Sequence, residues 1–269
     1  RRKDGTSVYM TQDIGLAQLK QKEFNTDASI YVVGDEQNYH FKVLKLICQK
    51  LKQPAADGIY HLSYGMVELP TGKMKSREGT VVDADDLVDE MINISKEKTE
   101  ALGKVSDFTK EQLTELYNTI GLGALKFFLL RVDPKKKMIF NPEESIDFHG
   151  FTGPFIQYTH ARIKSILRKT GTSVNISPNE LLPLEKQLAI ELSTFPEVVN
   201  EAADNLDPSK LAIYAFNIAK LFNTFYAEHS ISNAESEVKK QLRIQLGILT
   251  AAILQKAMSA LGIAVPEQM

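Results

Sequence analysis

Three positively charged residues fall within five positions of one short loop. They are Lys73, Lys75 and Arg77, in a loop that runs from Leu69 to Gly79 and begins with a Pro-Thr-Gly turn. Cations and backbone amides in a turn of this kind can bind a polyphosphate. Taken alone, the loop is interpreted more simply as a solvent-facing run of charge. It predicts phosphate binding only if its neighbours along the chain build a site with it.

A carboxylate and two polar side chains upstream could bind a guanidinium group. Asp13 follows Tyr9 by four residues, so the two lie on one face if this stretch is helical. A guanidinium presents its donors as a planar fork, and a carboxylate accepts two of them in parallel. Tyr9 would add a ring face or hydroxyl, and Gln37 an amide oxygen. The alternative is that Asp13 caps or pairs locally and that Gln37 is a surface amide.

Basic and aromatic residues are interleaved in a segment that runs from Pro154 to Lys169. Its basic and aromatic members are Phe155, Tyr158, His160, Arg162, Lys164, Arg168 and Lys169. Such a mixture can stack against and clamp unpaired RNA bases. The alternative is an amphipathic helix with Phe155 and Ile156 in a core, and residue by residue this alternative is favoured.

The composition is that of an ordinary globular protein. The 269 residues are 43% hydrophobic and 25% charged, a length that predicts two domains. The formal charge of −2 argues against wholesale wrapping of nucleic acid, although a local basic patch can still bind RNA. One cysteine, Cys48, excludes an internal disulfide and a cysteine-rich zinc site, which suits a reducing compartment. No apolar run approaches the roughly 18 residues of a membrane span.

Strands and helices alternate in the first third of the chain. The pattern predicts strands over residues 6–8, 28–33 and 59–64 and helices over residues 11–22 and 36–51. Alternation of this kind implies parallel strands with right-handed crossovers. Ligands collect at the carboxyl ends of such strands. We therefore expect the polar residues near Asp13 and Gln37 to reach the same edge as the basic loop.

Helices are predicted from the basic loop to the end of the chain. Asp83 and Thr109 can cap two of them, and Pro142 begins a short helical turn. Five more form a bundle over residues 152–170, 178–194, 196–204, 208–229 and 232–261. Gly262 is a natural helix stop and Pro266 follows it. We expect one domain over residues 1–145 and a helical domain over residues 146–269.

Four motifs, in order, resemble those of arginyl-tRNA synthetases, which are class I aminoacyl-tRNA synthetases. They occupy residues 4–14, 31–41, 65–79 and 153–162, and the resemblance covers nearly the whole chain. It implies the α/β half of a Rossmann-type catalytic domain followed by an all-α anticodon-binding bundle. The family's His-x-Gly-His signature is absent, because the histidines at 40, 61, 149, 160 and 229 never form it. We therefore expect a C-terminal fragment that lacks part of the active site, is inactive alone and has Met269 as its true end.

The resemblance also implies roles for individual residues. Arginine would be bound by Tyr9, Asp13 and Gln37. ATP would be approached by Gly34, His40, Met66, Lys73 and Ser76. The general class I pattern in the loop is Lys-Met-Ser-Lys-Ser, and here Ser76 occupies the second lysine position. Either Lys75 or Arg77 could replace that charge beside Lys73. Contacts with tRNA would come from Phe155, Tyr158, Arg162 and Met269.

A cytoplasmic arginine–tRNA ligase is the activity that follows from the resemblance. It would activate arginine with ATP and Mg²⁺, release pyrophosphate and transfer the arginyl group to tRNA(Arg). Neither a tightly bound cofactor nor a resident metal nor a membrane is expected. The full-length enzyme would be a monomer, whereas the fragment would self-associate through an exposed edge of the strand predicted over residues 28–33.

The sequence also allows two other functions. One is a non-catalytic tRNA-binding or interaction module that kept the fold and lost the chemistry. Against it, Tyr9, Asp13, Gln37 and Lys73 are all present. The other is a different nucleotidyl-transferring α/β enzyme, which would not account for the helical domain.

Overall fold

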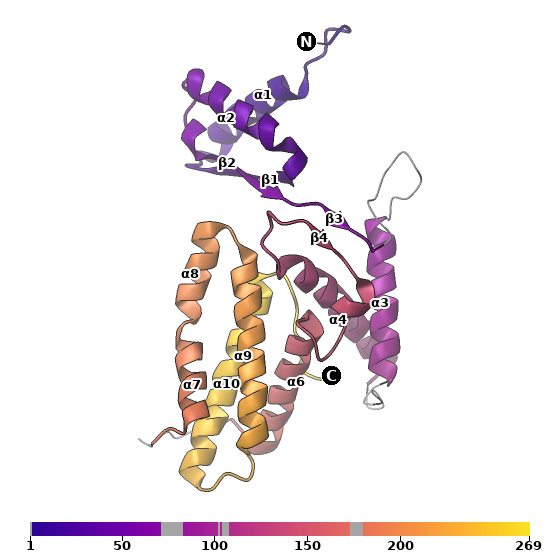
Figure 1. Cartoon of the computed structure of the whole chain (residues 1–269), viewed down its shortest axis with the longest axis vertical. Helices are drawn as coiled ribbons and strands as arrows, with labels where there is room; N and C mark the ends of the chain where they lie inside the picture. Colours follow the sequence, from indigo (N-terminus) through magenta and orange to yellow (C-terminus); the bar gives the residue numbers. More distant parts are fainter. Residues whose placement is uncertain (1, 71–82, 102, 104–107, 173–179) are drawn as a thin grey trace. The chain divides into compact units, whose positions relative to one another are not determined.

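Two compact units make up the chain in a computed structural model (Figure 1). The structure describes residues 2–70, 83–101, 103, 108–172 and 180–269. The first unit contains residues 1–67 and 134–138, and the second contains residues 68–133 and 139–269. The chain crosses between them through two short paired strands, β3 (Val67–Glu68) and β4 (Met138–Ile139). Four predicted loop residues, Lys73, Lys75, Ser76 and Arg77, lie outside the described residues.

The first unit is a small α/β layer. Its elements are α1 (Tyr9–Phe24), β1 (Ser29–Gly34), the short 3-10 helix η1 (Asp35–Gln37), α2 (Asn38–Lys50), η2 (Ala56–Gly58) and β2 (Ile59–Tyr64). The two strands are parallel and in register from Ser29 opposite Ile59 to Gly34 opposite Tyr64. Tyr31 points into a core with Phe41 and Leu44 of α2, because side chains alternate across a strand. The predicted parallel pair is thus confirmed.

One predicted strand is wrong. Residues 6–8 form no strand in the described structure. Instead the Asp4 carboxylate accepts hydrogen bonds from the backbone amide and the hydroxyl of Thr6, at 3.0 and 2.7 Å. A short acidic side chain that bonds to the backbone two residues on stabilises a turn rather than an extended strand.

Only one edge of β1 is paired among the described residues, and its partner there is β2. Ile30 and Val32 of β1 are 46% and 63% exposed. The expectation that this edge drives self-association stays a prediction.

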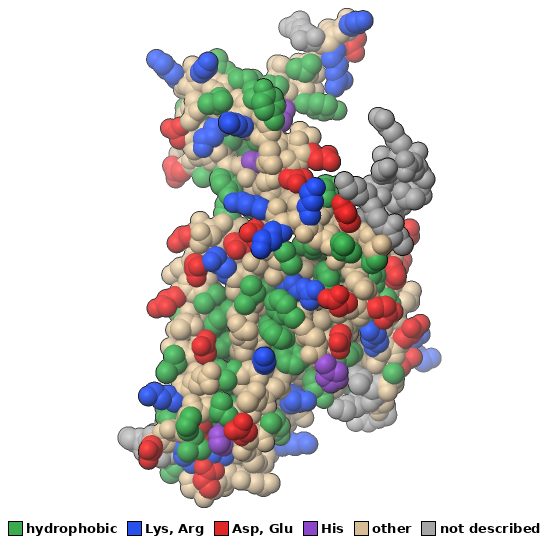
Figure 2. Space-filling view, viewed as in Figure 1, with side chains coloured by type: hydrophobic (Ala, Val, Ile, Leu, Met, Phe, Trp, Pro, Cys, Tyr) green, Lys and Arg blue, Asp and Glu red, His purple; other side chains and the backbone are tan. Residues whose placement is uncertain are grey.

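The second unit contains the helices that were predicted between the basic loop and the end of the chain, whereas the domain boundary expected at residue 145 stays a prediction. Its helices are α3 (Ala84–Ala101), α4 (Lys110–Leu130), α5 (Pro142–Ser145), α6 (Gly153–Thr170), α7 (Pro183–Ser193), α8 (Phe195–Asn205), α9 (Pro208–Glu228) and α10 (Glu237–Ala260). Helices α6, α9 and α10 pack on one another (Figure 1). Ile163, Phe222 and Leu254, one from each helix, are fully buried in the core of this unit. Side chains of both charge signs are interspersed over the face shown in Figure 2. None of the helices in the described part of the chain is long and apolar enough to span a bilayer.

Caps fix where these helices begin and end. The Thr109 hydroxyl accepts from the Gln112 amide while the Gln112 side chain accepts from the Thr109 amide, which is a complete capping box. Thr152 caps α6 in front of Pro154. Gly262, with φ at +69°, follows α10 in a conformation that favours glycine.

A buried carboxylate joins three parts of the bundle. Glu185 of α7 is fully buried, and its oxygens accept from Lys239 Nζ at 2.7 Å and Arg243 Nε at 2.9 Å, both on α10. It also accepts from the backbone amide of Leu182. Arg243 in turn donates to the Ser230 carbonyl, which fixes the turn between α9 and α10. Burial raises the pKa of Glu185, but the bonds from Lys239, the Leu182 amide and Arg243 outweigh burial and lower it.

We predict that Glu185→Gln destabilises the helical unit by about 3–5 kcal/mol, because it removes the carboxylate that two buried cations share and leaves Arg243 with only the exposed Glu235 as an ionic partner. The matched control is Glu201→Gln, which removes an exposed pair with Lys210 and should cost less than about 1 kcal/mol. Urea unfolding followed by circular dichroism measures both. Equal losses of stability in the two variants would contradict this prediction.

The pKa of Glu185 is lower in the folded state than in the unfolded state. The stabilisation that this carboxylate contributes is therefore present above pH 4.5 and is lost as pH falls below that.

Candidate functional site

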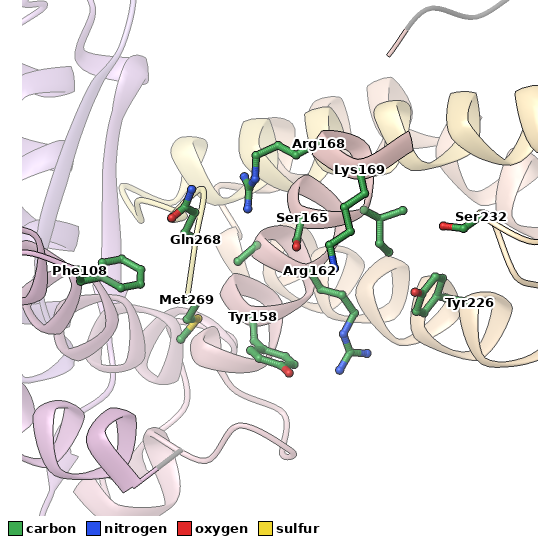
Figure 3. A pocket seen from close by; sticks show the side chains of 12 residues that line it. Phe108, Tyr158, Arg162, Ser165, Arg168, Lys169, Tyr226, Ser232, Gln268 and Met269 are labelled. Atoms are coloured by element: carbon green, nitrogen blue, oxygen red, sulfur yellow. The ribbon is translucent and has the colours of Figure 1, made fainter. Parts of the chain in front are cut away.

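A pocket of about 810 Å³ lies within the helical unit, beside α6 (Figure 3). Three cations, two tyrosines and two residues of the segment 261–269 belong to its lining, namely Arg162, Arg168, Lys169, Tyr158, Tyr226, Gln268 and Met269. No acidic side chain is among the described lining residues. The pocket is therefore suited to a ligand that combines negative charge with flat aromatic surface.

The sequence of α6 places these side chains. Tyr158, Arg162, Ser165 and Lys169 recur every three or four residues and so share one helix face, which Figure 3 shows lining the pocket. Ile156 and Ile163 lie fully buried in the bundle core. The predicted amphipathic helix and the predicted interleaving of basic and aromatic residues are therefore both present, on different faces.

Arg162 is held in a fixed position at the pocket. Its guanidinium lies 4.8 Å from the centre of the Tyr158 ring and donates to Asn223 Oδ1 of α9 at 2.9 Å. Asn223 is itself oriented by donating to Thr159 Oγ1 at 2.8 Å. A planar cation fixed over an aromatic ring offers flat surfaces on which an unpaired base can stack.

The segment 261–269 lies along α6 and is held by bonds to its backbone carbonyls. The bonds run from Lys126 Nζ to Gly262 O (2.8 Å), Gln157 Nε2 to Ala264 O (2.8 Å), His160 Nδ1 to Pro266 O (3.0 Å) and Arg168 Nη1 to Glu267 O (3.1 Å). Lys164 also pairs with the Glu267 carboxylate at 3.1 Å. These contacts place Gln268 and Met269 in the pocket lining.

The structure separates Phe155 from the other predicted tRNA contacts. Tyr158, Arg162 and Met269 line the pocket together. The Phe155 ring lies 5.2 Å from the ring of Phe216, against the core. The geometry therefore favours a packing role for Phe155, the alternative that the sequence already left open.

Tyr226 was not predicted to be a site residue. The sequence was interpreted there as bundle core, because Tyr226 follows Phe222 by four residues on an apolar helix. The structure agrees in part, since the two rings are stacked with their centres 6.2 Å apart. Tyr226 also lines the pocket, a half-buried position that a polar-tipped aromatic residue suits.

In the first unit the structure brings Asp13 and His40 together. Asp13 Oδ2 lies 2.6 Å from His40 Nε2, and their side chains are 29% and 22% exposed. Tyr9 lies one turn before Asp13, at the start of α1, and is 69% exposed, with the Arg2 guanidinium over its ring. Gln37 is exposed at the end of η1. The carboxylate keeps acceptor positions for a guanidinium, because it has about four lone-pair sites and His40 uses one.

Gly34 and Met66 lie at the carboxyl ends of the two parallel strands. Gly34 ends β1, and a Cβ there would lie 3.7 Å from the Tyr64 ring, in ordinary contact. Met66 is 39% exposed just beyond β2. Among the described residues, no three His, Cys, Asp or Glu side chains gather in a group that could hold a metal ion.

Burial controls the protonation of His160. Its imidazole is fully buried, and burial lowers the pKa of His160. The hydrogen bond to the Pro266 carbonyl and the charge of Glu267 raise this pKa, the charge of Lys164 lowers it further, and the net pKa is lowered. Because a carbonyl only accepts, the proton of the neutral ring sits on Nδ1. Nε2 has no hydrogen-bond partner among the described residues, so a second proton there would be buried and unpaired.

Comparison with known proteins gives a consistent match. A family model described as "tRNA synthetases class I (R), catalytic domain" matches residues 1–141, and "DALR anticodon binding domain" matches residues 156–269. The chain is 52% identical to the arginine–tRNA ligases of Amoebophilus asiaticus and Flavobacterium psychrophilum, with all of this chain matched. It covers 46% and 45% of these proteins, so it spans about half of their length.

Solved structures show the same relationship. The arginyl-tRNA synthetase of Thermus thermophilus superposes with a TM-score of 0.90 at 27% identity, over all of this chain and 50% of that one. The Plasmodium falciparum enzyme, at 21% identity and a TM-score of 0.80, shares the fold.

We predict that the stability of the helical unit falls as pH is lowered below 6.5, because the unfolded state binds a proton at the position of His160 before the folded state does. His160→Asn keeps a donor near the position of Nδ1 but cannot titrate, so its unfolding free energy should change less between pH 6.5 and 5. The control is His149→Asn, which removes an exposed imidazole and should keep the wild-type slope. Unfolding midpoints in urea at a series of pH values measure this. Identical slopes for wild type and His160→Asn would contradict it.

Proposed function

Because the chain belongs to the class I arginyl-tRNA synthetase family, we propose that the complete protein is an arginine–tRNA ligase acting in the cytoplasm. Its substrates are arginine, ATP with Mg²⁺ and tRNA(Arg). The observation that carries the proposal is the pocket in which Tyr158, Arg162 and Met269 meet, because all of its lining residues except Phe108 lie in the part of the chain matched by the anticodon-binding family model. The protein needs no tightly bound cofactor and acts as a monomer.

The reaction has two steps. The carboxylate of arginine forms a bond to the α-phosphorus of ATP as the bond to the β-phosphate bridge breaks, and pyrophosphate leaves. A ribose hydroxyl of the terminal adenosine of tRNA then attacks the arginyl carbonyl, its proton is lost and AMP departs. Neither step needs a covalent enzyme intermediate, so positioning and charge stabilisation supply the rate enhancement.

Arginine binds beside the Asp13–His40 pair. The Asp13 carboxylate accepts the guanidinium, Tyr9 covers it and Gln37 supplies an amide oxygen. The bond to His40 supports this role, because it holds the carboxylate in one orientation. ATP lies near Gly34, His40 and Met66 and reaches Lys73 and Ser76. Lys73, with Lys75 or Arg77, stabilises the charge that develops on the departing pyrophosphate.

The helical pocket binds an unpaired base of the tRNA. The Tyr158 ring and the Arg162 guanidinium provide stacking surfaces, and Met269 closes the apolar side. Arg168 and Lys169 lie in the same lining and attract the phosphates.

A second function, a tRNA-binding module without catalysis, is favoured by one observation: the 269 residues contain no His-x-Gly-His motif. We predict that this chain alone forms no arginyl-adenylate but does bind tRNA. Pyrophosphate exchange dependent on arginine, measured on the complete protein, distinguishes the two functions. Exchange by the 269-residue chain alone would show that this motif is dispensable.

We predict that Asp13→Ala in the complete enzyme raises the KM for arginine by a factor of tens to thousands and leaves the KM for ATP nearly unchanged. Losing one member of a charged pair that becomes buried when the ligand binds costs on the order of 2–5 kcal/mol. Asp27→Ala, which removes an exposed carboxylate between α1 and β1, is the control. Arginine-dependent pyrophosphate exchange provides both constants. An unchanged KM for arginine would remove Asp13 from the site.

We predict that Arg162→Ala and Tyr158→Ala each weaken tRNA(Arg) binding by roughly five- to 150-fold, the equivalent of one stacked base, about 1–3 kcal/mol. Arg162→Ala should in addition reduce the salt dependence of binding, because it removes one of the three cations in the pocket lining. Lys186→Ala removes an exposed cation on α7 that is outside the pocket lining and should change neither quantity. Fluorescence anisotropy at several salt concentrations measures all three variants. Wild-type affinity in both pocket variants would mean that the tRNA binds elsewhere.

A further inference from the structure

We infer that Gln157 and His160 are positioning residues for tRNA binding, because they hold the segment 261–269 against α6 so that Gln268 and Met269 form one wall of the pocket. Neither residue is in the pocket lining. Their effect on the RNA therefore passes through the segment. This inference rests on the proposed binding of RNA in that pocket.

The Gln157 side-chain amide links α6 to both α4 and the segment 261–269. The side chain is fully buried on α6. Its Nε2 donates one hydrogen bond to Thr119 O of α4 at 2.9 Å and another to Ala264 O at 2.8 Å. A primary amide nitrogen has two hydrogens, so both are used. One planar group therefore fixes the distance between α4, α6 and the segment 261–269.

Two glycines, Gly123 of α4 and Gly153 of α6, make room for this amide. A Cβ at Gly123 of α4 would lie 2.4 Å from Gln157 Nε2, closer than real Cβ contacts. A Cβ at Gly153 would lie 2.6 Å from Gly123 O. Two glycines on facing helices thus allow the close approach that lets a single side chain reach both carbonyls. The contact depends on small neighbours as well as on Gln157.

His160 makes the second attachment, one helical turn further along α6. Its Nδ1 donates to Pro266 O at 3.0 Å, and its ring is fully buried. Proline has no amide hydrogen, so its carbonyl is the only backbone group of Pro266 that can be bonded. The two attachments bracket Val265 and set the direction in which the chain continues to Gln268 and Met269.

Two further contacts hold the segment at Glu267, and they are more exposed than the bonds from Gln157 and His160. Arg168 donates to Glu267 O, and Lys164 pairs with a Glu267 side chain that is 57% exposed. Exposed ion pairs contribute little and are screened by salt. The side chains of Leu261 and Ile263 anchor the start of the segment in the core, and the buried bonds of Gln157 and His160 hold the part that continues to the pocket.

The test uses two substitutions that keep size and remove a donor, Gln157→Met and His160→Leu. A third, His160→Asn, keeps a donor near Nδ1 and is the conservative partner of His160→Leu. Tyr214→Phe is the matched control, because it removes another buried side-chain bond, from Tyr214 to Glu191 O, that does not involve the segment. Hydrogen exchange of peptides covering residues 261–269 reports segment attachment, and anisotropy with an arginine tRNA transcript reports binding.

We expect faster exchange of residues 261–269 and about tenfold weaker tRNA binding in Gln157→Met and His160→Leu, since each loses one or two hydrogen bonds. His160→Asn should restore both readings to near wild type. Tyr214→Phe should lower the thermal midpoint while leaving exchange of the segment and tRNA affinity unchanged. This pattern separates positioning from a general loss of stability.

Unchanged exchange of the segment in Gln157→Met and His160→Leu would overturn the inference, as would faster exchange with wild-type tRNA affinity. Equal loss of affinity in Tyr214→Phe would overturn it too, because only general stability would then be involved. Failure of the wild-type protein to bind the transcript would instead refute the proposed function of the pocket. The exchange measurement would still decide whether the two residues hold the segment.

Discussion

The Glu185 carboxylate is the constraint on which the helical unit depends. Apolar faces alone allow helices to slide past one another, since hydrophobic contact has no direction. Hydrogen bonds from Lys239 and Arg243 do have direction, and they set α7 against α10. Helix α10 packs in turn on α6 and α9, which carry the pocket. The position of Arg162 therefore depends indirectly on the ion cluster of Glu185, Lys239 and Arg243, although none of these three residues lines the pocket.

Much of the fold could be predicted, because helix ends are encoded locally. Thr109, Thr152 and Gly262 mark boundaries that the structure confirms within a residue or two. The start of α10 was placed five residues early, at 232 rather than Glu237, since the cap is Ser236 and not an earlier polar residue. The strand predicted over residues 6–8 is wrong for another reason. A short polar stretch can form a turn as easily as a strand, and here the hydrogen bond from the Thr6 amide to the Asp4 carboxylate stabilises the turn.

The candidate site could be predicted only in part. Tyr158 and Arg162 are four residues apart on one helix, so their proximity follows from spacing. Met269 lies more than a hundred positions away, and only the family resemblance connected it to them. The pairing of Asp13 with His40 was not foreseen, because these residues were assigned to different ligands. Long-range contacts of this kind depend on how elements pack, which local patterns do not encode.

The direction of the segment 261–269 has a practical consequence for handling the protein. Met269 lies in the pocket lining, so a peptide joined directly after it would begin inside the pocket. A purification tag fused there would compete for the space assigned to a base, and its effect would resemble that of a damaged binding site. Labels and surface tethers are better attached to an exposed side chain outside the pocket lining, such as Lys186 of α7.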